Sequence, residues 1–272
     1  LRLRADSPDS AQKVLDTVLN GTGMVKDDIH YVVGTGYGEA NIPIAKRTVS
    51  EIACHARGVV HSVGSPIRTI LVMGAQDCAA IHCNDRGKVT GFLMNACRRV
   101  YCPETYCHGC GAAQGRGMEL IADLLAVPIE EVAAMSLSVN DEQLQERPIL
   151  PPLEEGEESR ALPLSLVISN VCEVLAESQV MWLVREGWSK EEILAAYCVA
   201  MAHQGVLLLE RIGVIEEFVI TGGVAKNIGI VRRLEKELGI KAIIPEPDPQ
   251  LTGALGAALF ARDFLRSSGK AT

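Results

Sequence analysis

Three apolar, strand-like runs of this sequence each end in a short loop that contains glycine. The loops are residues 34–38 after the run 29–33, residues 74–77 after the run 68–73, and residues 222–223 after the run 218–221. Segments of helical periodicity alternate with these runs, which predicts an α/β protein whose helices cover a largely parallel sheet. Ligands of open α/β sheets bind beyond the carboxyl ends of the strands. We therefore expect the three loops to point the same way and to line one binding cleft.

The remaining pattern supplies the other helices and strands of such a fold. Helices are expected over residues 10–19, 48–57, 115–125, 172–186, 190–212, 228–238 and 253–265, and further strands over residues 78–83, 164–168 and 241–244. The polar turn at residues 84–87 marks residues 78–83 as a hairpin partner. The segment 190–212 is apolar on most faces, so we expect it to lie at the centre of the protein. Residues 143–163 place prolines around an acidic run, which predicts a surface loop or linker.

Composition excludes several classes of protein. The chain has 272 residues, 48% of them hydrophobic, and a net charge of −8 at pH 7. This length and hydrophobic content can fill a sizeable core, which excludes disorder over most of the chain. The acidic balance argues against a nucleic-acid partner, and no apolar run approaches the roughly 18 residues of a membrane span. Nine cysteines, an odd number, without a signal-peptide pattern indicate a reducing cytoplasm.

The cysteines divide into two kinds by their surroundings. Cys54, Cys78, Cys83 and Cys198 lie in apolar periodic stretches, so we expect them in the core. The other kind is a cluster of four, Cys97, Cys102, Cys107 and Cys110, together with Cys172. The density of the cluster is compatible with metal ligation, although its spacing matches no common zinc pattern and scattered thiols are the alternative.

Two of these cysteines lie close to expected helix starts. Cys110 comes shortly before the helix that begins near Gly115, and Cys172 falls in the first turn of its own helix. The amino end of a helix stabilises a thiolate. The alternative for Cys172 is a small residue packed at a strand–helix junction.

Glycine-rich segments near the carboxyl end allow a ligand or another helix to approach closely. At Gly222-Gly223 the backbone of a strand–helix turn is open to a nucleotide, and a plain tight turn is an equally good explanation. Residues 252–258 are a run of small side chains inside a helix. Close helix packing is the more frequent cause of such a run, and close approach of a ligand is the other.

In order along the chain, these motifs resemble the BadF/BadG/BcrA/BcrD ATPase family. That family comprises activators of 2-hydroxyacyl-CoA dehydratases and the ATP-hydrolysing subunits of benzoyl-CoA reductase. The motifs that carry the resemblance are Tyr37-Gly38, residues 48–58, residues 74–77, Cys110 with residues 115–117, Cys172 with residues 173–178, residues 221–227 and residues 250–259. The similarity extends from about Asp28 to Phe264.

The resemblance implies an actin/hexokinase/Hsp70-like (ribonuclease H-like) fold in which two α/β domains flank a nucleotide cleft. The division falls between residues 1–109 and 110–272, with the proline-acidic insertion at about 143–163. The resemblance also implies a two-fold dimer, homomeric or with a related ATPase subunit, that holds one 4Fe-4S cluster at its interface. Cys110 and Cys172 match the family's ligands, so each chain supplies two of the four thiolates that a cubane cluster needs.

The implied activity couples ATP to electron transfer. ATP or ADP, with Mg, binds in the cleft, and a low-potential electron passes to an acyl-CoA dehydratase or benzoyl-CoA reductase partner. The residues carried over by the resemblance are Gly222, Gly223 and Asn227 on the adenosine side, Gly74, Gln76 and Asp77 on the phosphate side, and Gly36 and Gly38 in the first glycine loop. Gln76 and Asp77 are the expected catalytic residues among them.

The chain departs from the family pattern at the phosphate side. The family begins with a strand–turn–strand that carries Asp-x-Gly-Ser/Thr, and nothing here matches it, so we expect the N-terminal strands of the fold to be missing. Val72 and Ala75 replace a usual aspartate and glycine, and Gln179 replaces an acidic residue. A catalytically degenerate member that binds metal as a structural or regulatory subunit is therefore the alternative. A sugar or acetate kinase of the same superfamily would leave the positions of Cys110 and Cys172 unexplained.

Overall fold

A mixed five-stranded sheet forms the centre of the protein. The computed structural model describes residues 8–36, 38–39, 42–64, 66–95, 114–146, 168–169, 173–215 and 217–268. The sheet comprises β3 (Thr69–Met73), β4 (Cys78–Cys83), β5 (Val89–Met94), β6 (Phe218–Thr221) and β7 (Ala242–Ile243), in the spatial order β5-β4-β3-β6-β7. The expected strands at 68–73, 78–83, 218–221 and 241–244 are thus confirmed, with bounds that differ by a residue at some ends.

The sheet is only half parallel, so the expectation of a largely parallel sheet is wrong, whereas the hairpin expected at residues 84–87 is confirmed by the antiparallel pair β4 and β5. β3 pairs in parallel with β6, and β6 with β7, whereas β3, β4 and β5 form an antiparallel meander. The reason is the length of the connections. Residues 74–77 and 84–88 are too few for the crossover of a dozen or more residues that a parallel pair needs.

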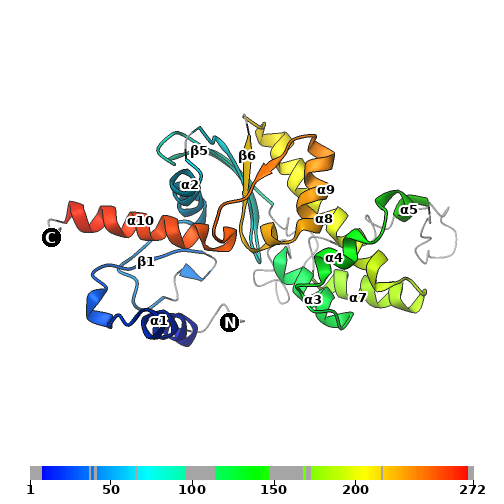
Figure 1. Ribbon diagram of the computed structural model, residues 1–272, viewed down its shortest axis with the longest axis horizontal. Coiled ribbons are helices and arrows are strands. Elements are labelled where there is room, and N and C mark those ends of the chain that lie inside the picture. The colour runs from blue at the N-terminus through cyan, green and yellow to red at the C-terminus, as the bar shows by residue number, and fades with distance from the viewer. Residues whose placement is uncertain are drawn as a thin grey trace, which may run out of the picture.

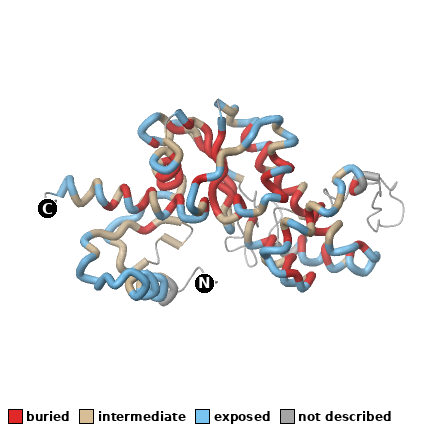
Figure 2. Tube along the Cα trace, viewed as in Figure 1, coloured by how far each residue is buried: buried red, intermediate tan, exposed pale blue. Residues whose placement is uncertain are grey.

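Helices cover both faces of the sheet (Figure 1). α2 (Glu51–Ser62) packs on one face against Ile70, Val72 and Ile81. α8 (Lys190–Ile212) lies on the other face, in the cluster that contains Leu71 and Met73. Alternate residues of β3 therefore face opposite helices, as the period of two in a strand requires. Figure 2 shows the buried residues concentrated along this sheet and α8.

The expectation that the segment 190–212 lies at the centre is confirmed. Tyr197 and Met201 of α8 are fully buried. The expectation that no apolar run approaches the length of a membrane span is wrong for α8, which alone within the described part of the chain is long and apolar enough to cross a membrane. Of its apolar window, 72% is buried inside the protein. Its apolar faces are thus covered by protein, as in the core helix of a globular domain.

A second unit lies beside α2. α10 (Thr252–Ser267) packs along α2 and reaches β1 (Val33–Gly34), which pairs in parallel with β2 (Arg47–Thr48), while α1 (Pro8–Thr22) lies below them in Figure 1. The short turn η1 (Lys26–Asp28) precedes β1. The expected strand over 29–33 is wrong in extent, because ladder pairing with β2 covers only Val33 and Gly34. The helix expected from residue 48 begins at Glu51, after the Ser50 cap.

A helical lobe occupies the opposite end of the molecule. It consists of α3 (Gly115–Leu124), α4 (Val132–Leu137), α5 (Asp141–Glu146) and α7 (Glu173–Arg185), packed around one end of α8 (Figure 1). The helices expected from residues 115 and 172 are confirmed over their described parts. Residues 143–146 belong to α5, so the expected loop at 143–163 begins too early, and its remainder lies outside the described residues, as do residues 164–167 of the expected strand.

The domain division at residue 109 stays a prediction. β3, β4 and β5 precede that residue and β6 and β7 follow it, yet all five belong to one sheet.

Candidate nucleotide site

The loop that follows β3 is fixed against the amino end of α3. The Gly74 amide donates to the Asp77 oxygen at 2.9 Å, which closes the loop. The amides of Gly115 and Arg116 donate to the oxygens of Gly74 and Ala75, at 3.1 and 2.9 Å. The structure therefore brings the expected phosphate-side loop together with the first turn of the helical lobe.

The glycine pair after β6 approaches the same strand end. Gly222 has a φ of +97°, and a Cβ atom there would lie 2.7 Å from the carbonyl carbon of Met73, the last residue of β3. Its amide donates to the Pro249 oxygen at 3.0 Å. Glycine at position 222 is thus required by the turn and by the neighbouring strand. Gly223 begins the turn η3 (Gly223–Lys226), and an added Cβ there would touch only the Gln250 side chain, at 3.6 Å.

Asn227 caps the helix that follows this loop. Its Oδ1 accepts from the amides of Gly229 and Ile230, at 2.9 and 3.3 Å, at the start of α9 (Ile228–Leu238). Its Nδ2 lies 4.0 Å from the Cys198 sulfur. The Asn227 side chain therefore stabilises the turn that joins the glycine pair to α9.

Gln76 and Asp77 are half-buried beside the amino end of α2. Burial raises the pKa of the Asp77 carboxyl, and the nearby Glu51 carboxylate raises it further. A Cβ on Gly74 would lie 3.6 Å from Glu51 Oε1. Two carboxylates from separate elements thus meet at the phosphate-side loop.

A row of polar side chains, Glu51, His55 and Thr221, leads from this loop to β6. The sequence reasoning did not single out this row. His55 Nε2 lies 3.6 Å from Glu51 Oε1, and His55 Nδ1 lies 3.3 Å from Thr221 Oγ1. Thr221 Oγ1 donates to the Pro249 oxygen, so the proton between His55 and Thr221 is assigned to Nδ1. The spacing of Glu51 and His55, four residues apart in an otherwise apolar helix, is the sequence signal that could have revealed this row of polar side chains.

The first glycine loop lies on the α2 side. Gly36 has a φ of +88°, and its oxygen accepts from the Glu39 amide at 3.0 Å. Gly38 follows in the same turn, whereas Tyr37 lies outside the described residues. The preceding Thr35 hydroxyl is buried near the Cys54 thiol of α2.

Helix packing accounts for the small residues at 252–258. A Cβ on Gly256 would lie 2.6 Å from the carbonyl carbon of Cys54, and one on Gly253 would lie 2.9 Å from His55 Nε2. The close contact of α10 with α2 leaves no room for larger side chains at these two positions. The packing interpretation is confirmed.

The expected metal ligands Cys110 and Cys172 lie outside the described residues, as do Cys97, Cys102 and Cys107. Where the structure describes the chain, no group of three or more potential ligands is close enough to hold a metal ion. The helices that follow the two cysteines, α3 and α7, pack against each other. In the sequence, each expected ligand thus precedes one of two helices that pack together.

The four remaining cysteines are buried, as expected. Burial raises the pKa of each of their thiols, to about 11 for Cys198. They remain protonated at neutral pH and are poor metal ligands.

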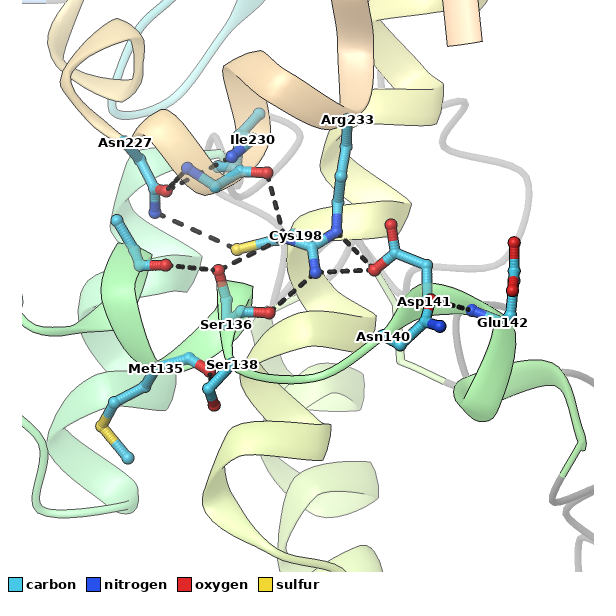
Figure 3. Close-up of polar contacts among 12 residues, drawn as sticks. Met135, Ser136, Ser138, Asn140, Asp141, Glu142, Cys198, Asn227, Ile230 and Arg233 are labelled. Atoms are coloured by element: carbon cyan, nitrogen blue, oxygen red, sulfur yellow. Dashed lines mark hydrogen bonds and ion pairs between the residues drawn. The ribbon is translucent and has the colours of Figure 1, made fainter. Parts of the chain in front are cut away.

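A buried arginine joins the site to the helical lobe (Figure 3). Arg233 of α9 bonds to Ser136 at the end of α4 and to Asp141 at the start of α5. Sequence reasoning missed this group, because nothing in the local pattern pairs residues 92 positions apart.

A mixed sheet is flanked by helices, and two glycine-bearing loops meet at the ends of its central parallel strands, where α/β proteins bind their ligands. The sequence model of the BadF/BadG/BcrA/BcrD ATPase family matches residues 3–261, starting well before the similarity expected from residue 28. The chain belongs to this family.

Individual relatives agree with that assignment. The chain is 34% identical over 258 residues to the 2-hydroxyisocaproyl-CoA dehydratase activator of Clostridioides difficile, covering 95% of this chain and 83% of the relative. It is 35% identical over 250 residues to the activator of lactoyl-CoA dehydratase of Anaerotignum propionicum, covering 92% and 82%. A solved structure of the activator of the 2-hydroxyisocaproyl-CoA dehydratase from Clostridium difficile with bound ADPNP matches with a TM-score of 0.74 and 33% identity, over 96% of this chain and 84% of that one.

Proposed function

We propose that this protein is an ATP-hydrolysing activator that delivers low-potential electrons to a 2-hydroxyacyl-CoA dehydratase or benzoyl-CoA reductase. One observation carries the proposal. The loop 74–77 is hydrogen-bonded to the start of α3, and α3 packs on α7, so the expected phosphate loop is joined to the two helices that follow Cys110 and Cys172. A nucleotide-dependent movement of that loop would thus reach both expected cluster ligands.

The nucleotide would lie across the two glycine loops. Gly74, Gln76 and Asp77 take the phosphate side, with Mg, and Gly222 and Gly223 take the adenosine side. The Asp77 carboxylate orients the attacking water or the metal, and Gln76 assists it. Asn227 supports the adenosine loop as the cap of α9. Gly36 and Gly38 complete the cleft from the α2 side, and residues 1–109 and 110–272 are the two parts proposed to flank it.

The donor set fits a 4Fe-4S cluster shared by two chains. Cys110 and Cys172 supply two thiolates per chain, so a two-fold dimer completes the four ligands, while the buried thiols stay protonated. When bound, the cluster supplies one-electron transfer at low potential. A reducing cytoplasm suits both the cluster and the free thiols.

The test is ATP hydrolysis by anaerobically purified protein, together with iron and sulfide analysis and ATP-dependent activation of a 2-hydroxyacyl-CoA dehydratase. We expect about four iron and four sulfide per dimer, ATP turnover, and dehydratase activation only when ATP is present. Protein that binds iron but does not hydrolyse ATP, even with the dehydratase, would instead be a structural or regulatory subunit.

A further inference from the structure

We infer that Arg233 is a positioning residue that couples the nucleotide loop of α9 to the helical lobe. The inference rests on the proposed function, because it takes residues 222–227 as one wall of the nucleotide cleft. It assigns a mechanical role to a buried group that the nucleotide and cluster sites do not use.

The guanidinium of Arg233 is saturated with partners from three elements (Figure 3). Its Nε donates to Asp141 Oδ1 at 2.8 Å, and its Nη2 lies 2.6 Å from the same oxygen. Nη2 also donates to the Ser136 oxygen at 2.8 Å, and Nη1 to Ser136 Oγ at 3.3 Å and the Gly229 oxygen at 3.0 Å. Only 6% of the Arg233 side chain is exposed, so these bonds lie in a region of low dielectric constant, where they are stronger than in water.

The contact of α9 with Ser136 places the helical lobe next to residues 222–227, the loop proposed to bind adenosine. A Cβ on Gly229 would overlap the Ser136 hydroxyl and lie 3.0 Å from Asn227 Oδ1. The end of α4 therefore touches the first turn of α9, where Asn227 caps the helix. A shift of this turn cannot occur without moving either Ser136 or the arginine that holds it.

The lobe has a second attachment at the other wall of the cleft, through the bonds of Gly115 and Arg116 to the loop 74–75. With both attachments intact, a change in the distance between the two nucleotide loops would move the lobe. Without Arg233 the lobe would lose its polar link to α9 and keep its hydrogen bonds to the phosphate-side loop. We therefore expect Arg233 to transmit nucleotide binding from α9 to α4 and α5.

Hydrogen exchange of the full chain with and without Mg-ADP tests this coupling. In the wild type, ADP should slow exchange in residues 222–230 and also in residues 132–146. In Arg233→Met the protection should be confined to residues 222–230, and the Kd for ADP should rise about tenfold, within the range of couplings measured for residues that link sites. Arg232→Met, an exposed arginine on the same helix, is the matched control and should behave as wild type.

A second variant covers the case in which Arg233→Met does not fold. Asp141→Asn keeps an oxygen acceptor for Arg233 but removes its charge, and it should weaken protection of residues 132–146 and raise the Kd for ADP about threefold. Full transmission of protection in both variants would overturn the positioning role. Wild-type protein that neither binds ADP nor shows protection of residues 222–230 would overturn the proposed function itself, and the coupling with it.

Discussion

A Cβ atom on Gly222 would lie 2.7 Å from the carbonyl carbon of Met73, closer than side chains pack in folded proteins. Met73 ends β3 and Gly222 follows β6, and the two strands are parallel neighbours. The contact fixes the separation of the two loops that we assign to the phosphate and adenosine ends of the nucleotide.

Gly222→Ala should therefore be strongly destabilising. The variant combines a positive φ with a collision against backbone, and both effects together should lower the free energy of unfolding by about 3 kcal/mol, as measured by urea denaturation. Gly213→Ala is the control, because Gly213 also has a positive φ of +82° but has open space around it. That variant should cost about 1 kcal/mol. Equal costs would mean that the approach of β3 is not what requires glycine.

The sequence predicted the elements with a strong local signal and missed the relations between them. The bounds of α8 and β6 follow from a long segment that is apolar on most faces, and from a strand-like apolar run that ends in glycine. The antiparallel direction of β4 had a local signal, the polar turn at residues 84–87, which marks residues 78–83 as a hairpin partner. The hydrophobic pattern itself does not distinguish parallel from antiparallel neighbours.

The site shows the same limit. Gly222 was singled out by its local motif, but its close neighbour Met73 became visible only in the fold. The ion pair of Arg233 with Asp141 joins two helices that are far apart in sequence, and each residue alone reads as an ordinary surface charge. Long-range polar contacts of this kind depend on how the helices pack, which no local window contains.

Asp77→Asn should raise stability at neutral pH while it lowers ATP turnover. Because burial and Glu51 raise the pKa of Asp77 in the folded protein, folding favours its protonated form. The ionised carboxylate therefore costs stability as the pH rises from the unfolded pKa through the raised folded value, and this cost persists at pH 7. The neutral amide removes it. We expect a higher Tm than wild type at pH 7, a difference that disappears at a pH below the unfolded pKa, and roughly a 100-fold loss of kcat.

The exposed Asp85, in the turn between β4 and β5, provides the control for this change. Asp85→Asn should leave both Tm and turnover close to the wild-type values. If Asp77→Asn melted below wild type at pH 7, the carboxylate would be making favourable bonds, and the assignment of a destabilising charge at this loop would be wrong.

Gly256→Ala tests whether the small-residue run serves helix packing. Its Cβ would lie 2.6 Å from the carbonyl carbon of Cys54, so α10 must move away from α2. Overpacking of this kind should lower the free energy of unfolding by about 2–3 kcal/mol. Ala258→Leu changes an exposed position of the same run and should stay within about 0.5 kcal/mol of wild type. Comparable losses in the two variants would mean that close contact with α2 is not what requires glycine at position 256.

Cys172→Ala and Cys110→Ala should each abolish binding of the cluster, because a 4Fe-4S centre at a two-fold axis loses two of its four thiolates when one ligand per chain is removed. Iron and sulfide analysis of anaerobically purified protein, with the absorption of the cluster, measures the effect. Cys83→Ala is the matched control. Its thiol is buried and its pKa is raised by that burial, so it is protonated at neutral pH and should contribute nothing to the metal. The control should therefore keep its full iron content at a cost of about 1 kcal/mol in stability. A Cys172→Ala protein with wild-type iron content would exclude this residue as a ligand and direct attention to Cys97, Cys102 and Cys107.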